Sequence, residues 1–227
     1  MARSKKPTSR PAAAPRRRLS RDRILRSALR IADREGVAAL SMRRLGQALG
    51  CEAMSLYNHV ANKDDVLDGI VDLVIGEMEP PTPDAPDWRR AMHRRAHSAH
   101  EVLLRHPWSA ALIVSRVNAG PHNLAYVDAT LGCLLGAGFS FELADRAWNA
   151  IDSHVHGFTL LELNFPFEPD AYATAAAAYL PSLPAERYPH LHALTVEVAE
   201  GRHRGIHDFD FGLELILDGL ERLLAAR

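Results

Sequence analysis

Two short helical segments, separated by a single glycine-containing turn, constrain the fold more than any other feature of this chain. They lie in ALSMRRLGQALGCEAMSLYNHV, residues 39–60. Gly46 in the first segment allows the second helix to cross closely, and Gly50 accommodates the tight turn between them. The side chains expected to pack between the two segments are Leu45, Leu49, Leu56 and Val60. This pattern predicts a helix-turn-helix.

The charge of the chain is divided unevenly along its length. Residues 1–63 carry 15 Lys and Arg side chains against 4 Asp and Glu, whereas residues 64–227 carry 12 against 24. The net charge of −1 therefore hides a basic N-terminal third and an acidic remainder. A basic third indicates a polyanionic partner, and the second helix of a helix-turn-helix enters the major groove of DNA. Together these features predict DNA binding; a basic tail without a partner is the alternative.

The rest of the chain also has helical periodicity, with Gly and Pro between the segments and no alternating strand pattern. Ser20, Ser41 and Asn62 are suitable N-caps for the first, second and fourth helices, and a short third helix is expected at about Glu52–His59. Further helices are expected at about Trp88–Arg105, Pro107–Val117, Pro121–Ala137, Glu142–Glu162, Glu186–Glu200 and Asp208–Ala226, with a helical turn or two around Ala171–Tyr179. The predicted fold class is all-α.

Composition also predicts how the chain is divided. Residues 1–19 combine Pro, Ala, Ser and positive charge and are expected to form a disordered basic arm. The run PPTPDAPD, residues 80–87, is the one clear linker, because Pro removes backbone donors and disfavours helix in the residue before it. We therefore expect a three-helix helix-turn-helix domain with a connecting helix at residues 20–79, and a helical body at residues 88–227.

Several classes of protein are not supported by the sequence. No stretch approaches the ~20 apolar residues that span a bilayer, and the basic N-terminus leads into Ala and Pro rather than an apolar signal segment. Cys51 and Cys133 have no metal-ligand spacing and fit a reducing cytoplasm. The sequence contains no P-loop, no G-x-S-x-G and no H-E-x-x-H motif, so we do not expect an enzyme.

Residues 20–79, above all LSRDRILRSALRIADREGVAALSMRRLGQALGCEAMSLYNHVANKDDVLDGI, resemble the DNA-binding domain of the TetR family of transcriptional repressors. The following residues, to about 164, are similar to the tetracycline-repressor-like subgroup through RHPW and LGAGFS. This resemblance implies a homodimer that binds a DNA operator through two heads. It also implies that residues 88–227 form a ligand-binding and dimerisation domain, and that a small molecule bound there releases the operator. A constitutive DNA-binding protein without a ligand is the alternative.

The resemblance also assigns DNA-binding roles. Arg43 matches a position that contacts bases or backbone, Tyr57 and His59 match positions that hold phosphates, and Lys63 is expected to act as a point charge. Where relatives often carry a polar base reader, this chain has Ala53 and Met54, which could contact thymine methyl groups. The residues expected to bind DNA are Arg43, Ala53, Met54, Ser55, Tyr57, Asn58, His59 and Lys63.

Interior aromatic and polar side chains of the body predict a pocket for the effector. The candidate ligand-binding residues are His100, Trp108, Tyr126, Trp148, Asp152 and His156. Plain core packing is the alternative for any one of the aromatic side chains. A tetracycline–magnesium chelate is not expected, because the magnesium-binding His of the tetracycline repressor falls at Val114. Two polar drug-contacting positions fall at Arg95 and Ala99.

Eleven of the twelve His residues follow residue 64. His93, His97 and His100 share a helix face, and His203 and His207 repeat the four-residue spacing. Imidazoles at this spacing can chelate one metal ion. Since no acid or Cys completes a known signature, we expect neither a metal nor another cofactor, and a metal-responsive regulator is retained as the alternative.

The last helices of the body are the candidates for a dimer interface. The segment Asp208–Ala226 has apolar side chains around much of its circumference, more than one face of a monomer needs. Together with Glu142–Glu162 it is expected to form a four-helix interface between two copies of the chain.

Overall fold

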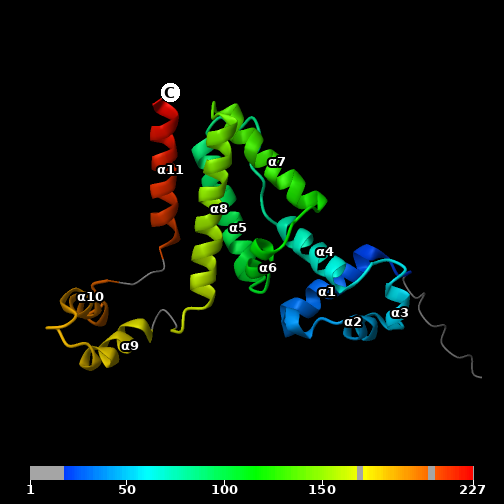
Figure 1. Ribbon diagram of the computed structural model, residues 1–227, viewed down its shortest axis with the longest axis horizontal. Coiled ribbons are helices and arrows are strands. Elements are labelled where there is room, and N and C mark those ends of the chain that lie inside the picture. The colour runs from blue at the N-terminus through cyan, green and yellow to red at the C-terminus, as the bar shows by residue number, and fades with distance from the viewer. Residues whose placement is uncertain (1–17, 168–170, 204–207, 227) are drawn as a thin grey trace, which may run out of the picture. The chain divides into compact units, whose positions relative to one another are not determined.

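The computed structural model describes residues 18–167, 171–203 and 208–226, and every regular element in these ranges is a helix (Figure 1). The predicted all-α class is confirmed. The chain divides into two compact units, one up to Val66 and one from Leu67 onward, which we call the head and the body. Most of the expected basic arm, residues 1–17, lies outside the described ranges. In those ranges, no helix is both long and apolar enough to cross a lipid bilayer.

The helices of the head begin and end where local signals predict. The structure has α1 at Arg21–Glu35, a 3-10 turn at Val37–Ala39, α2 at Met42–Leu49, α3 at Ala53–Leu56 and α4 at Lys63–Ile75. The predicted N-caps Ser20, Ser41 and Asn62 are confirmed, since each side-chain oxygen accepts a hydrogen bond from the amide three residues on, at 3.3, 3.1 and 2.8 Å. Gly36 and Gly50, which follow α1 and α2, have φ angles of +79° and +66°.

The crossing of α2 and α3 depends on Gly46. A Cβ at this position would lie 2.9 Å from the carbonyl oxygen of Cys51, so any larger side chain would push the two helices apart. Leu45 and Leu56 are fully buried at this crossing, whereas Leu49, also expected to pack inward, is only half-buried. The third helix is shorter than predicted, because residues 57–59 form a turn in place of a further helical turn.

The body contains the remaining helices at nearly the predicted bounds. They are α5 (Trp88–Arg105), α6 (Ser109–Ser115), α7 (Pro121–Gly136), α8 (Phe141–Leu163), α9 (Tyr172–Tyr179), a 3-10 turn at Leu180–Ser182, α10 (Pro189–Ala199) and α11 (Phe209–Ala225). Of these, α5 has the expected bounds. The helix α8 packs against α5, α6, α7 and α11, and α9 packs against α10 (Figure 1). The largest fully buried apolar side chains of the body are Ile70, Met92, Leu103, Leu134, Ile151, Leu213 and Leu217.

The boundary between the compact units lies within α4. From the sequence, the whole connecting helix is expected to belong to the N-terminal domain. In the structure, the second half of α4 is bound to the end of α6 and the start of α7: Asp68 pairs with Arg116, just after α6, at 2.6 Å, and Asp72 accepts a hydrogen bond from the amide of Asn123, in the first turn of α7, at 3.0 Å. One continuous helix therefore belongs to both units.

Candidate functional site

The candidate DNA-binding residues lie on the surface of the head. Leu56 is fully buried and fixes the inner side of α3, while Met54 is 75% exposed and Tyr57 is 44% exposed. Arg43 is exposed on α2, and Lys63 is exposed as the first residue of α4. Of the others, Asn58 and His59 are exposed in the turn after α3, and Ala53 and Ser55 are half-buried. The contact roles that the resemblance assigned to these residues stay predictions.

An ion pair fixes the start of α4 against α1. Both guanidinium NH2 groups of Arg21 donate to the carboxylate of Asp65, at 2.8 and 2.7 Å, and the amide of Ala61 donates to the same carboxylate at 2.8 Å. The hydrogen bond from Arg21 lowers the pKa of Asp65. Because Lys63 lies two residues before Asp65, this pair holds the backbone that carries Lys63 in a defined position.

A small cavity lies between helices of the body. Four of the six candidate ligand-binding residues line it, together with mainly apolar side chains such as Ile75, Met78 and Val155. The four are Tyr126 of α7 and Trp148, Asp152 and His156 of α8. The cavity measures about 40 Å³. A space therefore exists where the pocket is predicted, but it is much smaller than a drug-sized ligand requires, and an effector bound there stays a prediction.

A buried arginine contacts two of the residues that line the cavity, Asp152 and Tyr126. Arg95 of α5 is 1% exposed, and its Nη1 donates to Asp152 Oδ1 at 2.8 Å. Its Nε donates to Thr130 Oγ1 at 2.9 Å, and its guanidinium lies 4.6 Å from the centre of the Tyr126 ring. Burial lowers the pKa of Arg95, but Asp152 and Tyr126 together outweigh burial, so the pKa of Arg95 is raised. The Trp148 indole N–H holds the other Asp152 oxygen at 2.6 Å.

Three buried polar atoms around the cavity have no hydrogen-bond partner among the described residues: Arg95 Nη2, Tyr126 Oη and His156 Nδ1. Burial raises the pKa of Tyr126 to about 12, against the opposing effect of Arg95, so its hydroxyl keeps its proton. Burial lowers the pKa of His156, which favours the neutral ring. Unpaired buried polar groups are costly, so these three atoms are available for further hydrogen bonds.

The structure does not bring the other two candidates into the cavity lining. His100 faces α8, where Nδ1 lies 2.8 Å from Thr159 Oγ1 and Nε2 lies 3.1 Å from Glu162 Oε2. Burial lowers the pKa of His100. The Trp108 ring lies beside His106, with 6.3 Å between the ring centres.

The fold and the comparisons now identify the family. Residues 80–224 match the family model for the tetracyclin repressor-like C-terminal domain, which is more than half of the chain. The chain belongs to the TetR family of transcriptional regulators. It is 38% identical over 160 residues to an HTH-type transcriptional regulator of Saccharopolyspora erythraea, covering 70% of this chain and 68% of that one. It is 32% identical to the HTH-type transcriptional repressor DrrR1 of Streptomyces coeruleorubidus, covering 96% of this chain and 83% of the repressor.

Solved structures give the same result. The apo structure of ActR from Streptomyces coelicolor has a TM-score of 0.79 and 33% identity, covering 95% of this chain and 99% of ActR. ActR has also been solved with actinorhodin, at a TM-score of 0.75 over 92% of this chain and 98% of that one. The TetR-family resemblance seen in the sequence is confirmed.

Arg95 is the residue that the sequence interpretation of this TetR-family chain missed. In the sequence, Arg95 stands out only as a departure from a tetracycline-contacting position. A signal was nevertheless present, because Arg95 lies within the apolar stripe of α5, one turn after Ala91 and one turn before Ala99. A charged side chain within a buried stripe requires a partner, and that partner, Asp152, lies on another helix.

Proposed function

We propose that this TetR-family regulator is a homodimeric repressor that leaves its DNA operator when a small molecule enters the cavity of the body. The observation that carries the proposal is the group of unpartnered buried polar atoms at that cavity. The cavity is lined mainly by apolar side chains, which favours an amphipathic effector. Such an effector would present oxygen or nitrogen atoms to Tyr126 and His156. The similarity to ActR, which has been solved with actinorhodin, supports a ligand in this domain.

The small volume of the cavity suggests how release occurs. Pockets for drug-sized ligands measure ~300–1,000 Å³, so an effector has to separate the helices around the present space of about 40 Å³. Ile75, the last residue of α4, lines this space, and Lys63, a proposed phosphate contact, is the first residue of the same helix. A displacement of α4 at Ile75 would therefore also move Lys63 at the other end of the helix. A coupling of ~1–3 kcal/mol would reduce operator affinity about 5- to 150-fold.

Exposed apolar side chains support a dimer formed through α8 and α11. Large apolar side chains on the surface of these helices are Phe141, Leu161, Phe211, Leu215 and Leu223. Since α8 and α11 pack against one another, a second copy of the chain can cover both helices and bury these side chains.

The role proposed for the body is regulatory rather than enzymatic. Asp152 is occupied by Arg95 and Trp148, while His154 Nε2 lies 2.9 Å from the backbone oxygen of Phe209. These groups do not form an acid–base–nucleophile arrangement, although they are close in sequence.

The DNA-binding proposal is tested by selecting an operator from random duplexes with the purified protein and then measuring affinity against salt. We expect Lys63→Ala to weaken binding to all duplexes and to reduce the logarithmic salt slope by about 1, as for one phosphate contact. Arg43→Ala should cost ~1–3 kcal/mol of operator affinity if Arg43 reads a base. Arg146→Ala is the matched control, because it removes the same charge from an exposed pair in the body. Equal losses for Arg43→Ala and Arg146→Ala would contradict the assignment.

The effector proposal is tested with actinorhodin as the probe. Its addition should quench the fluorescence of Trp148 and release the selected operator. Tyr126→Phe removes the unpartnered hydroxyl and should weaken the probe about fivefold. Tyr188→Phe, at an exposed position before α10, should not. If a panel of amphipathic compounds including actinorhodin changes neither fluorescence nor operator affinity, the constitutive DNA-binding alternative is the better one.

A further inference from the structure

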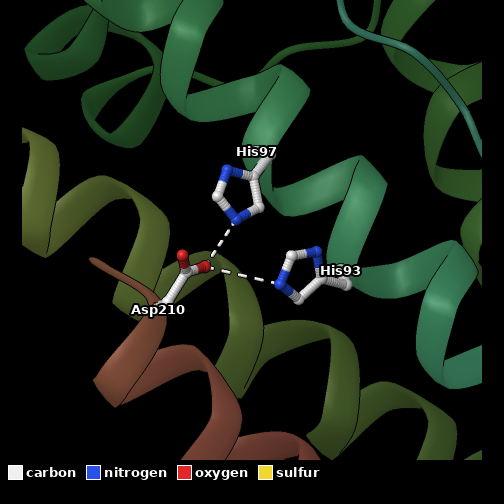
Figure 2. A group of neighbouring side chains, drawn as sticks. All are labelled: His93, His97 and Asp210. Carbon is white, nitrogen blue, oxygen red and sulfur yellow. Dashed lines mark hydrogen bonds and ion pairs between the residues drawn. The ribbon is translucent and has the colours of Figure 1, made fainter. Parts of the chain in front are cut away.

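Two histidines of α5 and one aspartate of α11 point their side chains toward one another outside the cavity (Figure 2). His97 Nε2 lies 2.6 Å from Asp210 Oδ1, and His93 Nε2 lies 3.4 Å from the same oxygen. The two imidazole rings stack with 4.5 Å between their centres, and the His97 ring packs edge-on against Phe209. These ring contacts hold both Nε2 atoms on the side that faces α11.

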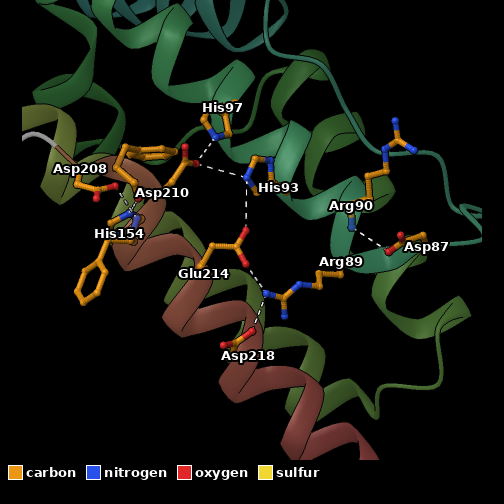
Figure 3. Close-up of polar contacts among 12 residues, drawn as sticks. Asp87, Arg89, Arg90, His93, His97, His154, Asp208, Asp210, Glu214 and Asp218 are labelled. Carbon is orange, nitrogen blue, oxygen red and sulfur yellow. Dashed lines mark hydrogen bonds and ion pairs between the residues drawn. The ribbon is translucent and has the colours of Figure 1, made fainter.

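A second carboxylate lies beside this group, close to His93. Glu214, one turn after Asp210 on α11, places Oε1 3.5 Å from His93 Nε2 (Figure 3). Its other oxygen is bound by Arg89, which also donates to Asp218 at 2.6 Å. The carboxylate of Glu214 is therefore held in place by a neighbouring cation, while its Oε1 remains directed at His93.

The distances from His93 Nε2 to the two neighbouring carboxylate oxygens suit a tetrahedral ion. Zn²⁺ binds imidazole nitrogen at ~2.0–2.1 Å and carboxylate oxygen at ~2.0–2.2 Å, which sets neighbouring ligand atoms ~3.3–3.5 Å apart. The distances from His93 to Asp210 and Glu214, 3.4 and 3.5 Å, already match this spacing. The 2.6 Å contact between His97 and Asp210 is a hydrogen bond, and it would lengthen by less than ~1 Å to admit the ion.

The exposure and the chemistry of these side chains also favour binding of a transition-metal ion. His93, His97, Asp210 and Glu214 have side-chain exposures of 36%, 33%, 58% and 44%, so an ion can reach the site from solvent. Two imidazoles with two carboxylates favour a transition metal over Mg²⁺ or Ca²⁺, which prefer oxygen ligands. The sequence grouped His93 and His97 with His100, but the structure turns His100 toward α8 and supplies the acids from α11.

We propose that His93, His97, Asp210 and Glu214 bind one divalent transition-metal ion, with Zn²⁺ as the leading candidate, and that this ion fastens α11 to α5. The site is separate from the cavity of the body, and the inference does not depend on the proposed response to an effector. Because the ligands come from two helices that are far apart in sequence, bound metal stabilises the folded body over the unfolded chain.

The test uses the full-length protein after treatment with a chelator. Titration with Zn²⁺ should show one site per chain by calorimetry and should raise the Tm. Co²⁺ should give the visible absorption bands of a tetrahedral ion with nitrogen and oxygen ligands. His93→Ala and His97→Ala should each weaken Zn²⁺ binding at least tenfold and remove the Tm increase. Asp210→Asn keeps the size of the side chain and should have the same effect, which guards against a variant that fails to fold.

His190→Ala is the matched control, because His190 is an exposed histidine of α10 outside the group. It should bind Zn²⁺ as the wild type does. The proposal is overturned if the wild type shows no tetrahedral Co²⁺ spectrum, or if Zn²⁺ affinity is unchanged in His97→Ala and Asp210→Asn. It is also overturned if His190→Ala loses binding to the same extent. Operator affinity is not part of the readout, so failure here leaves the repressor proposal unaffected.

Discussion

The head and the body are both built from packed helices, but they place their charged side chains differently. In the described part of the head, the buried side chains are apolar except for Ser27, and the ion pairs, such as Arg21–Asp65, lie at or near the surface. In the body, Arg95 is buried with Asp152 beside it, and three polar atoms nearby have no hydrogen-bond partner in the described part of the chain. The head therefore directs its polar groups outward to a large partner, whereas the body directs several of them inward, where only a small molecule can reach them.

The largest expected effect comes from breaking the buried pair of the body. Asp152→Ala leaves the Arg95 charge buried without its carboxylate, and loss of one partner of such a pair costs ~3–5 kcal/mol. The measurement is urea unfolding of the full-length protein. Asp128→Ala, an exposed acid of α7, is the control and should change stability by less than ~0.5 kcal/mol. Adding Arg95→Met to Asp152→Ala should recover part of the loss; no recovery would mean that the buried charge is not its cause.

A smaller effect is expected from overpacking the head. Gly46→Ala places a methyl group 2.9 Å from the Cys51 carbonyl oxygen, and the backbone has to shift, at a cost of ~1–3 kcal/mol. Because α3 moves with that shift, operator affinity should fall as well. Gly157→Ala on α8 meets nothing within 4 Å and should leave stability unchanged or raise it by up to ~1 kcal/mol. If both substitutions have the same sign and size, close helix crossing does not explain Gly46.

A pH effect distinguishes the interior of the body from the surface of the head. Burial holds the pKa of His156 below its ordinary value, so the unfolded chain takes up a proton more readily than the folded one. Stability should therefore fall as the pH drops below about 6.5, by at most ~1.4 kcal/mol per pH unit for one group. In the presence of a chelator, His156→Gln should show a smaller loss between pH 7.5 and 5.5 than the wild type. His59→Gln, at an exposed position of the head, should retain the full loss.

The same contrast explains what the sequence could and could not predict. The bounds of α1 and α2 follow from Ser20, Ser41 and the glycines that end these helices, because capping is a local interaction. The exposed positions of α3 follow from Leu56 as the inner residue. The Arg95–Asp152 pair and the approach of Asp210 to His97 join helices that are far apart in sequence, and no local spacing encodes such pairs. The sequence therefore predicted which side chains of the head are exposed more completely than it predicted the contacts between distant helices of the body.

The smallest expected effect concerns exposed ion pairs. It tests whether burial explains the difference between the charged side chains of the head and those of the body, or whether the two units differ in some other way. Arg26–Asp22 in the head and Arg146–Glu142 in the body are both pairs four residues apart on a helix, with side chains 64% or more exposed. Such pairs contribute ~0.3–0.5 kcal/mol, because water screens the charges. Arg26→Ala and Arg146→Ala should therefore lower the free energy of unfolding by similar, small amounts that shrink further at 0.5 M salt, a concentration at which the Debye length falls to about 4 Å. A loss above ~1 kcal/mol in only one of them would show that the two units differ in more than the burial of their charges.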